Sequence, residues 1–182
     1  MKNQVAPSPI DVQAFADAGE SLAGTGTVGQ HQRLMDETAG QGTDQPLTWS
    51  VHGELRNREH LTPDAWLHLQ VQTVLPLVCQ RCLEKVDVDL AVDRWFRFVA
   101  EESTAAAQDD QSEEDVLVLS RSFDLMTLIE DELLMEMPAV ARHEICPQPV
   151  QMVVEDADFE AASQQKAQPF AVLQALKADK RQ

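Results

Sequence analysis

The chain has no tyrosine and only three cysteines among its 182 residues. A small, odd number of cysteines in a chain of this length argues against a disulfide framework. No hydrophobic run approaches the roughly 20 residues that a membrane helix needs. The first seven residues also lack the apolar core of a secretory signal. We therefore expect a cytoplasmic protein that does not associate with membranes and whose cysteines stay reduced.

Recognisable catalytic motifs are missing as well. The sequence contains no nucleophile elbow, no His-Glu-x-x-His pair and no phosphate-binding loop. The glycines of residues 24–29 match the dinucleotide-binding pattern, but we interpret them as part of a loop because a polar segment follows them. We expect a non-enzymatic protein with no small-molecule substrate. The alternative is an enzyme whose site is built from carboxylates that no motif marks.

Basic residues are scarce, and the acidic ones are concentrated. The formal net charge is −17, and residues 100–160 contain 17 acidic and two basic side chains, hence −15 of that total. The rest of the chain is nearly neutral. A phosphate backbone would be repelled by the acidic part, whereas a basic protein would be attracted to it. One hypothesis is therefore that the acidic part binds a basic protein; the other is that it only keeps the chain soluble.

Three segments alternate between apolar and polar residues. The apolar positions are Leu47, Trp49, Val51 and Leu55 in the first segment, Leu67, Leu69, Val71, Leu75 and Leu77 in the second, and Val86, Val88, Leu90, Val92, Phe96 and Phe98 in the third. This period of two is typical of antiparallel strands that cover a core on one side. Arg94 interrupts the apolar pattern, so we expect a bulge or an edge there. Residues 116–119 could add a fourth short strand.

The remaining segments predict helices and loops around this sheet. Apolar spacing predicts a short helix that ends at Gly19 and another that begins after Asp124 and ends before Pro138. Pro169 could begin a terminal helix. Residues 100–115 hold seven acids and no base, which favours a solvated loop.

The predicted fold class is α+β, with an antiparallel sheet of three to four strands covered by a helix, an acidic loop and short terminal helices. We expect an N-terminal helix and polar linker in residues 1–46, with residues 23–46 as loop. An α+β domain follows in residues 47–177, with the acidic loop at 100–115, and residues 178–182 form a tail.

Cys79 and Cys82 stand two residues apart in the predicted turn between the second and third strands. Two thiolates at this spacing can bind one zinc ion, and a closed tetrahedral site needs two more ligands. His143 and Cys146 could supply them if the segment after Pro138 folds back onto the turn. We expect three free thiols and no cofactor, with a zinc site as the alternative.

A second candidate site is a set of basic residues, Arg81, Lys85, Arg94 and Arg97, beside Trp95 and Phe96. Arginine and aromatic side chains on a sheet can bind RNA by phosphate pairing and base stacking. The same basic residues could instead pair with Asp87, Asp89 and Asp93. Direct binding of RNA is therefore the competing hypothesis to binding of a basic protein.

Four segments occur in an order that resembles a known family. They are Val78-Cys79-Gln80-Arg81-Cys82, the helix from Leu128 to Leu134 followed by Met137-Pro138, the segment from His143 to Cys146, and Pro169-Phe170-Ala171-Val172-Leu173-Gln174-Ala175-Leu176-Lys177. Together they resemble the bacterial YceD family, named for large ribosomal RNA subunit accumulation.

The resemblance extends from about Leu47 to Lys177. It implies a non-enzymatic ribosome-biogenesis factor, needed for the synthesis, processing or stability of large-subunit (23S) ribosomal RNA. Such a factor would bind either a basic ribosomal protein, through the acidic part, or large-subunit ribosomal RNA, through the basic set. The alternative is a metal-dependent nuclease that acts in the processing of this RNA. Some relatives carry extra cysteines where this chain has Arg142–Pro149, and those resemble a full zinc site. This chain has only Cys146 there.

Overall fold

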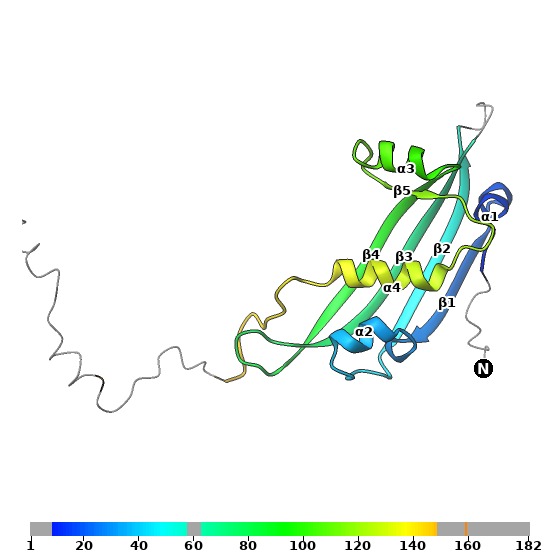
Figure 1. Cartoon of the computed structure of the whole chain (residues 1–182). Helices are drawn as coiled ribbons and strands as arrows, with labels where there is room; N and C mark the ends of the chain where they lie inside the picture. The colour runs from blue at the N-terminus through cyan, green and yellow to red at the C-terminus, as the bar shows by residue number, and fades with distance from the viewer. Residues whose placement is uncertain (1–8, 58–62, 149–158, 160–182) are drawn as a thin grey trace, which may run out of the picture. The chain divides into compact units, whose positions relative to one another are not determined.

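The computed structural model describes residues 9–57, 63–148 and 159. Residues Met1–Cys146 form one compact unit, and Pro147–Gln182 form a second. The first unit contains a five-stranded sheet (Figure 1). Its strands lie side by side in chain order: β1 (Ser21–Thr27), β2 (Pro46–Arg56), β3 (Asp64–Val78), β4 (Lys85–Val99) and β5 (Asp115–Val118). Each of the first four strands is antiparallel to the next, whereas β5 is parallel to β4.

The three strands that alternation predicts are confirmed as β2, β3 and β4. Side chains of one parity are buried, including Leu47, Val51, Leu67, Leu69, Val71, Leu75, Leu90, Val92, Phe96 and Phe98. The predicted α+β class is also confirmed. β3 and β4 have 15 residues each and form one hairpin. At about 3.3 Å per residue, this hairpin is roughly 45 Å long.

Helices cover the buried face of the sheet. α1 (Val12–Ala18) packs on β2, α4 (Leu125–Glu136) packs on β4, and the short α2 (Gln32–Glu37) lies against α4 (Figure 1). α1 ends at Gly19 in the left-handed conformation, as predicted. α4 begins after Asp124, whose side chain accepts hydrogen bonds from the backbone N–H groups of Met126 and Thr127. These two predicted helices are confirmed.

The prediction of a loop in residues 23–46 is wrong. β1 occupies residues 21–27 and pairs along its whole length with β2, a 3-10 turn follows at Val28–Gln30, and α2 comes next. The strand adds main-chain hydrogen bonds to the edge of the sheet, so its residues need few apolar side chains. Gly24 fits there because a Cβ atom at this position would collide with the ring of Trp49.

The prediction of a solvated acidic loop at residues 100–115 is also wrong. Residues Glu102–Asp109 form α3, which packs on β5 and β4 through the buried Ala105. The three consecutive alanines of this segment are strong helix formers. Asp109 accepts a hydrogen bond from the backbone N–H of Val116, which ties the helix to β5. The fourth expected strand is present as β5, but it is parallel rather than antiparallel.

Arg94 lies neither at a bulge nor at an edge, contrary to the prediction. It pairs with Leu69 in an unbroken register between β3 and β4. Its side chain shares the parity of the core and extends under α4, where it meets carboxylates. The predicted terminal helix at Pro169 lies outside the described residues.

Candidate metal site at the hairpin tip

The turn between β3 and β4 meets the segment that follows α4. We call residues 78–85 and 139–146 together the hairpin tip. The backbone N–H of Gln80 donates to the carbonyl of Ala141 at 2.9 Å, which joins the two segments. Figure 1 shows the yellow segment after α4 running down to the green turn. The fold-back that the candidate zinc site required is therefore present.

Four side chains come together at the hairpin tip: Cys79, Cys82, His143 and Cys146. Their ligand atoms all lie within 4.8 Å of one another, and Cys82 Sγ lies 3.4 Å from His143 Nδ1. Cys79 is fully buried and the other three are partly buried. The four side chains form one cluster that could hold a metal ion, although Cys82 and His143 are 61 residues apart in the chain.

The backbone of the turn shapes the cluster around Cys79. The backbone N–H of Cys79 donates to the carbonyl of Glu84, and that of Leu83 donates to the carbonyl of Cys79. Burial raises the pKa of Cys79, but hydrogen bonds from the backbone N–H groups of Cys82, His143 and Arg81 outweigh it and lower the pKa to about 5. At neutral pH Cys79 therefore favours the thiolate, and the thiolate is the form that binds metals.

The spacing of the cluster fits a tetrahedral ion. A metal–sulfur bond of about 2.3 Å places two sulfurs of a tetrahedral site about 3.8 Å apart, close to the spread of these atoms. Burial, followed by the two neighbouring thiols, raises the pKa of Cys146. A cation at the centre would offset the mutual repulsion of these thiolates. Three sulfurs and one imidazole are a donor set that is typical of zinc.

The basic residues proposed as an RNA site do not share one surface. Arg81 lies exposed in the hairpin tip, and Lys85 lies at the start of β4, where it pairs with Asp87 at 2.9 Å. Arg94 and Arg97 differ in parity, so they extend from opposite faces of the sheet. Arg97 donates a hydrogen bond at 3.1 Å to the Oγ of Ser112, which follows α3 in the chain.

Arg94 belongs to an ion-pair cluster on the covered face. Its Nε lies 3.3 Å from Glu132 Oε2, and its other nitrogens lie 3.8 Å from Glu136 and 3.9 Å from Asp115. Glu132 is 4% exposed, and its Oε2 accepts no hydrogen bond from the described residues. Burial raises the pKa of this carboxyl, while Arg94 lowers it. Arg94 therefore compensates a buried charge.

The uncovered face of the sheet carries a stack that the sequence pattern did not reveal. The Arg56 guanidinium lies 4.1 Å from the ring centres of both Trp66 and Trp95, and His68 stacks on Trp95 at 4.4 Å. The imidazole also lies 2.6 Å from Asp93. All five residues share the polar parity of their strands, so alternation could have placed them together. Arg56 and His68 already occupy the Trp95 ring, whereas the buried Trp66 Nε1 has no hydrogen-bond partner among the described residues.

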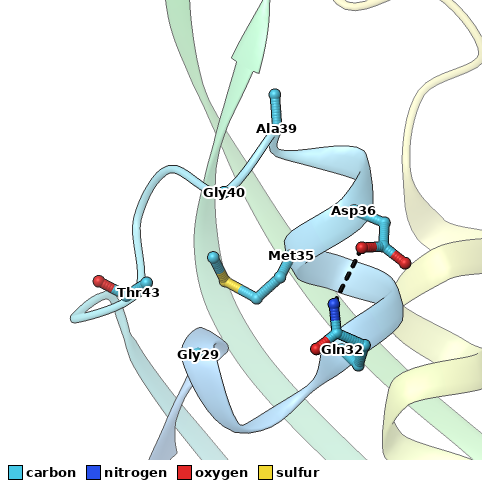
Figure 2. A pocket seen from close by; sticks show the side chains of 7 residues that line it. All are labelled: Gly29, Gln32, Met35, Asp36, Ala39, Gly40 and Thr43. Atoms are coloured by element: carbon cyan, nitrogen blue, oxygen red, sulfur yellow. Dashed lines mark hydrogen bonds between the residues drawn. The ribbon is translucent and has the colours of Figure 1, made fainter.

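Two open hollows lie elsewhere on the described residues. One, of about 520 Å³, lies beside α2 with Met35 in its centre (Figure 2). Asp36, which lines this hollow, accepts a hydrogen bond from the Gln32 side chain at 2.9 Å. The other, of about 730 Å³, lies between α1 and the residues after β5. Neither holds a cluster of metal ligands comparable to the hairpin tip, so we place the candidate site at the tip.

Among the described residues, no helix is both long enough and apolar enough to cross a membrane. The fold and the site define a small α+β protein whose long hairpin carries a four-ligand cluster at its tip. The chain belongs to the YceD family: the family model described as "Large ribosomal RNA subunit accumulation protein YceD" matches residues 67–177, more than half of the chain. This match confirms the resemblance seen in the sequence. Neither the curated proteins nor the solved structures gave a match.

Proposed function

We propose that this protein is a non-enzymatic factor that large-subunit ribosomal RNA needs in order to accumulate, and that it acts by binding. The observation that carries the proposal is its membership of the family named for that accumulation. The geometry of the hairpin tip supports a binding role. Four protein ligands complete a tetrahedral site, whereas catalytic zinc sites keep one position for water or substrate.

We further propose that the ion at the hairpin tip is zinc and that its role is structural. Cys79 and Cys82 would hold it from the turn, and His143 and Cys146 from the segment after α4. The hydrogen bond between Gln80 and Ala141 and the contact between Cys82 and His143 already join the two segments. Zinc would therefore fix the shape of the tip.

A deletion strain tests the function. We expect the ratio of mature large-subunit to small-subunit RNA to fall in the deletion strain and to recover when the wild-type gene is restored. The measurement is the ratio of the two RNAs at several growth temperatures. An unchanged ratio at every temperature would contradict the proposed function.

A cleavage assay separates this function from the nuclease alternative. Labelled large-subunit precursor RNA incubated with the purified chain and Mg²⁺ should stay intact. Cleavage that disappears with a chelator, and in a variant lacking the responsible carboxylate, would favour a nuclease.

A further inference from the structure

The hairpin tip differs in charge from the rest of the chain. Its two segments contain three basic residues, Arg81, Lys85 and Arg142, and two acidic ones, Glu84 and Glu144. Arg81 and Arg142 are exposed, and neither lies within 4.0 Å of a carboxylate among the described residues. Three thiolates and a zinc ion would add one negative charge inside the tip. The tip is thus near neutral, with two guanidinium groups available.

The two arginines flank the candidate metal ligands. Arg81 precedes Cys82, and Arg142 precedes His143, whose ligand atoms lie 3.4 Å apart. A metal bound there would hold the two backbones at a fixed separation. A fixed backbone lowers the entropy cost of placing two guanidinium groups on phosphates, for which their donors are well suited.

Exposed aliphatic side chains lie beside these arginines. Ile145 is 88% exposed and Leu83 is 75% exposed. Leu83 has φ +63, in the left-handed region where glycine is favoured. Neither the backbone nor packing within the described residues explains a leucine at this position. An external apolar surface would explain both exposed side chains.

The acidic residues of α3 lie far from the hairpin tip. α3 and β5 pack beside the end of β4 that holds Phe96–Val99, while the tip lies beyond Val78 and Lys85. The separation is roughly 35–45 Å along the strands. Charges are screened over about 8 Å at physiological salt. The acidic end therefore does not repel a phosphate at the tip.

We infer that the hairpin tip binds single-stranded RNA, with Arg81 and Arg142 on phosphates and Leu83 and Ile145 on base faces. The inference rests on the proposed role in large-subunit RNA accumulation and names the partner of that site. Unpaired bases offer apolar faces for aliphatic contact, whereas a duplex hides them in its stack.

The test is a titration of a labelled single-stranded RNA of about 12 nucleotides with the zinc-loaded full chain, followed by fluorescence anisotropy at several salt concentrations. The double substitution Arg81→Ala/Arg142→Ala should weaken binding about tenfold or more. It should also reduce the slope of the logarithm of the binding constant against the logarithm of the salt concentration by about 1.4. Each phosphate contact on a single strand contributes about 0.7 to that slope. Arg121→Ala is the matched control, since it removes an exposed arginine outside the tip; its affinity should stay within about twofold.

The Leu83→Gly variant distinguishes a loss of RNA contact from a loss of stability. Glycine suits φ +63, so thermal stability should hold or rise, while RNA affinity should fall several-fold. Unchanged affinity in both Leu83→Gly and the double arginine variant would overturn the inference, as would duplex RNA binding as tightly as single-stranded RNA.

The proposed function can survive failure of this inference. If the deletion phenotype is present but the wild-type chain does not bind RNA, the tip assignment is wrong and the biological role stands. If the double arginine variant binds RNA normally yet fails to restore large-subunit RNA in the deletion strain, the arginines contact another partner, and the RNA inference is overturned.

Discussion

Glu132 is the clearest case of a single residue whose environment opposes its usual charge. It lies on α4 and is almost completely buried, and the Arg94 side chain beside it is 40% exposed. Burial is the largest influence and raises the pKa of the carboxyl above its ordinary value of 4.5. A buried ion pair of this kind contributes less than its geometry suggests, because both charges give up water.

Glu132→Gln should therefore stabilise the protein at neutral pH. A carboxyl whose pKa is raised on folding favours its protonated form in the folded state, so the wild type gains stability as pH falls through the raised pKa toward 4.5. The glutamine side chain does not titrate, so the variant has no such gain. The advantage of the variant should shrink over that interval, as measured by urea unfolding at a series of pH values.

Glu136→Gln is the matched control for this prediction. Glu136 pairs with the same arginine but is 39% exposed, so its substitution should change the free energy of unfolding by less than about 0.5 kcal/mol. A Glu132→Gln variant less stable than wild type at neutral pH would mean that the pairing with Arg94 outweighs the cost of burial.

The cysteine ligands support a second prediction at this scale. The purified chain should contain about one zinc per molecule, and Cys79→Ser/Cys82→Ser should contain none. Adding zinc to the metal-free wild type at about a thousandfold its Kd should stabilise the fold by about 4 kcal/mol. Metal analysis and thermal unfolding with and without chelator measure both effects.

Glu144→Gln, next to the ligand His143, should keep the zinc and respond to chelator as the wild type does. Its neighbours in the chain are unchanged, and its carboxylate is exposed. Protein purified without chelator that contains no zinc, or a double variant that keeps it, would contradict the prediction.

The sequence allowed the four ligands to be named but not to be brought together. Spacing alone singled out Cys79 and Cys82, because two residues between thiolates suit one ion. His143 and Cys146 were candidates only on the condition that their segment folded back. That condition depends on the length of α4 and on the contact between Gln80 and Ala141. Neither is a local property of the sequence.

At the scale of elements, the errors have one physical origin. β2, β3 and β4 bury one face, so their alternation reveals them. β1 is an edge strand with mostly exposed residues, and its register comes from β2 rather than from its own pattern. α3 buries mainly Ala105, so its helical period carries almost no apolar signal. Elements that bury little of their own surface could not be predicted from periodicity.

The packing of α1 on β2 gives a prediction for an element pair. A Cβ atom added at Gly53 would lie 2.5 Å from the Phe15 ring and 3.1 Å from the backbone of Ala16. Gly53→Ala should therefore push α1 away and lower the free energy of unfolding by about 1–3 kcal/mol. Thr48→Ala, on the exposed face of the same strand, should change it by less than about 0.5 kcal/mol.

Urea unfolding of the two variants tests the pair. Equal stability of Gly53→Ala and wild type would show that α1 shifts without cost, and that it is not a fixed part of the buried layer.

At the scale of the whole first unit, charge is separated along the hairpin. Arg33 and Arg94 pair with the four carboxylates of α4, so two positive charges offset two of the four negative charges of that helix. Asp110, Glu113 and Glu114, near the other end of the hairpin, take part in none of the ion pairs of the described residues. The two ends can therefore bind partners of opposite charge without strong interference.

The last prediction separates those two ends. Asp110→Asn/Glu113→Gln/Glu114→Gln should leave the affinity for single-stranded RNA within about twofold at physiological salt, because a separation of roughly 35–45 Å exceeds the screening length several times. The same variant should weaken binding of a labelled deca-lysine peptide, a probe for a basic protein, by about tenfold at low salt. Arg81→Ala/Arg142→Ala should do the reverse, losing RNA and keeping the peptide. If neutralising the three acids instead tightens RNA binding about tenfold, RNA lies along α3 and not at the hairpin tip.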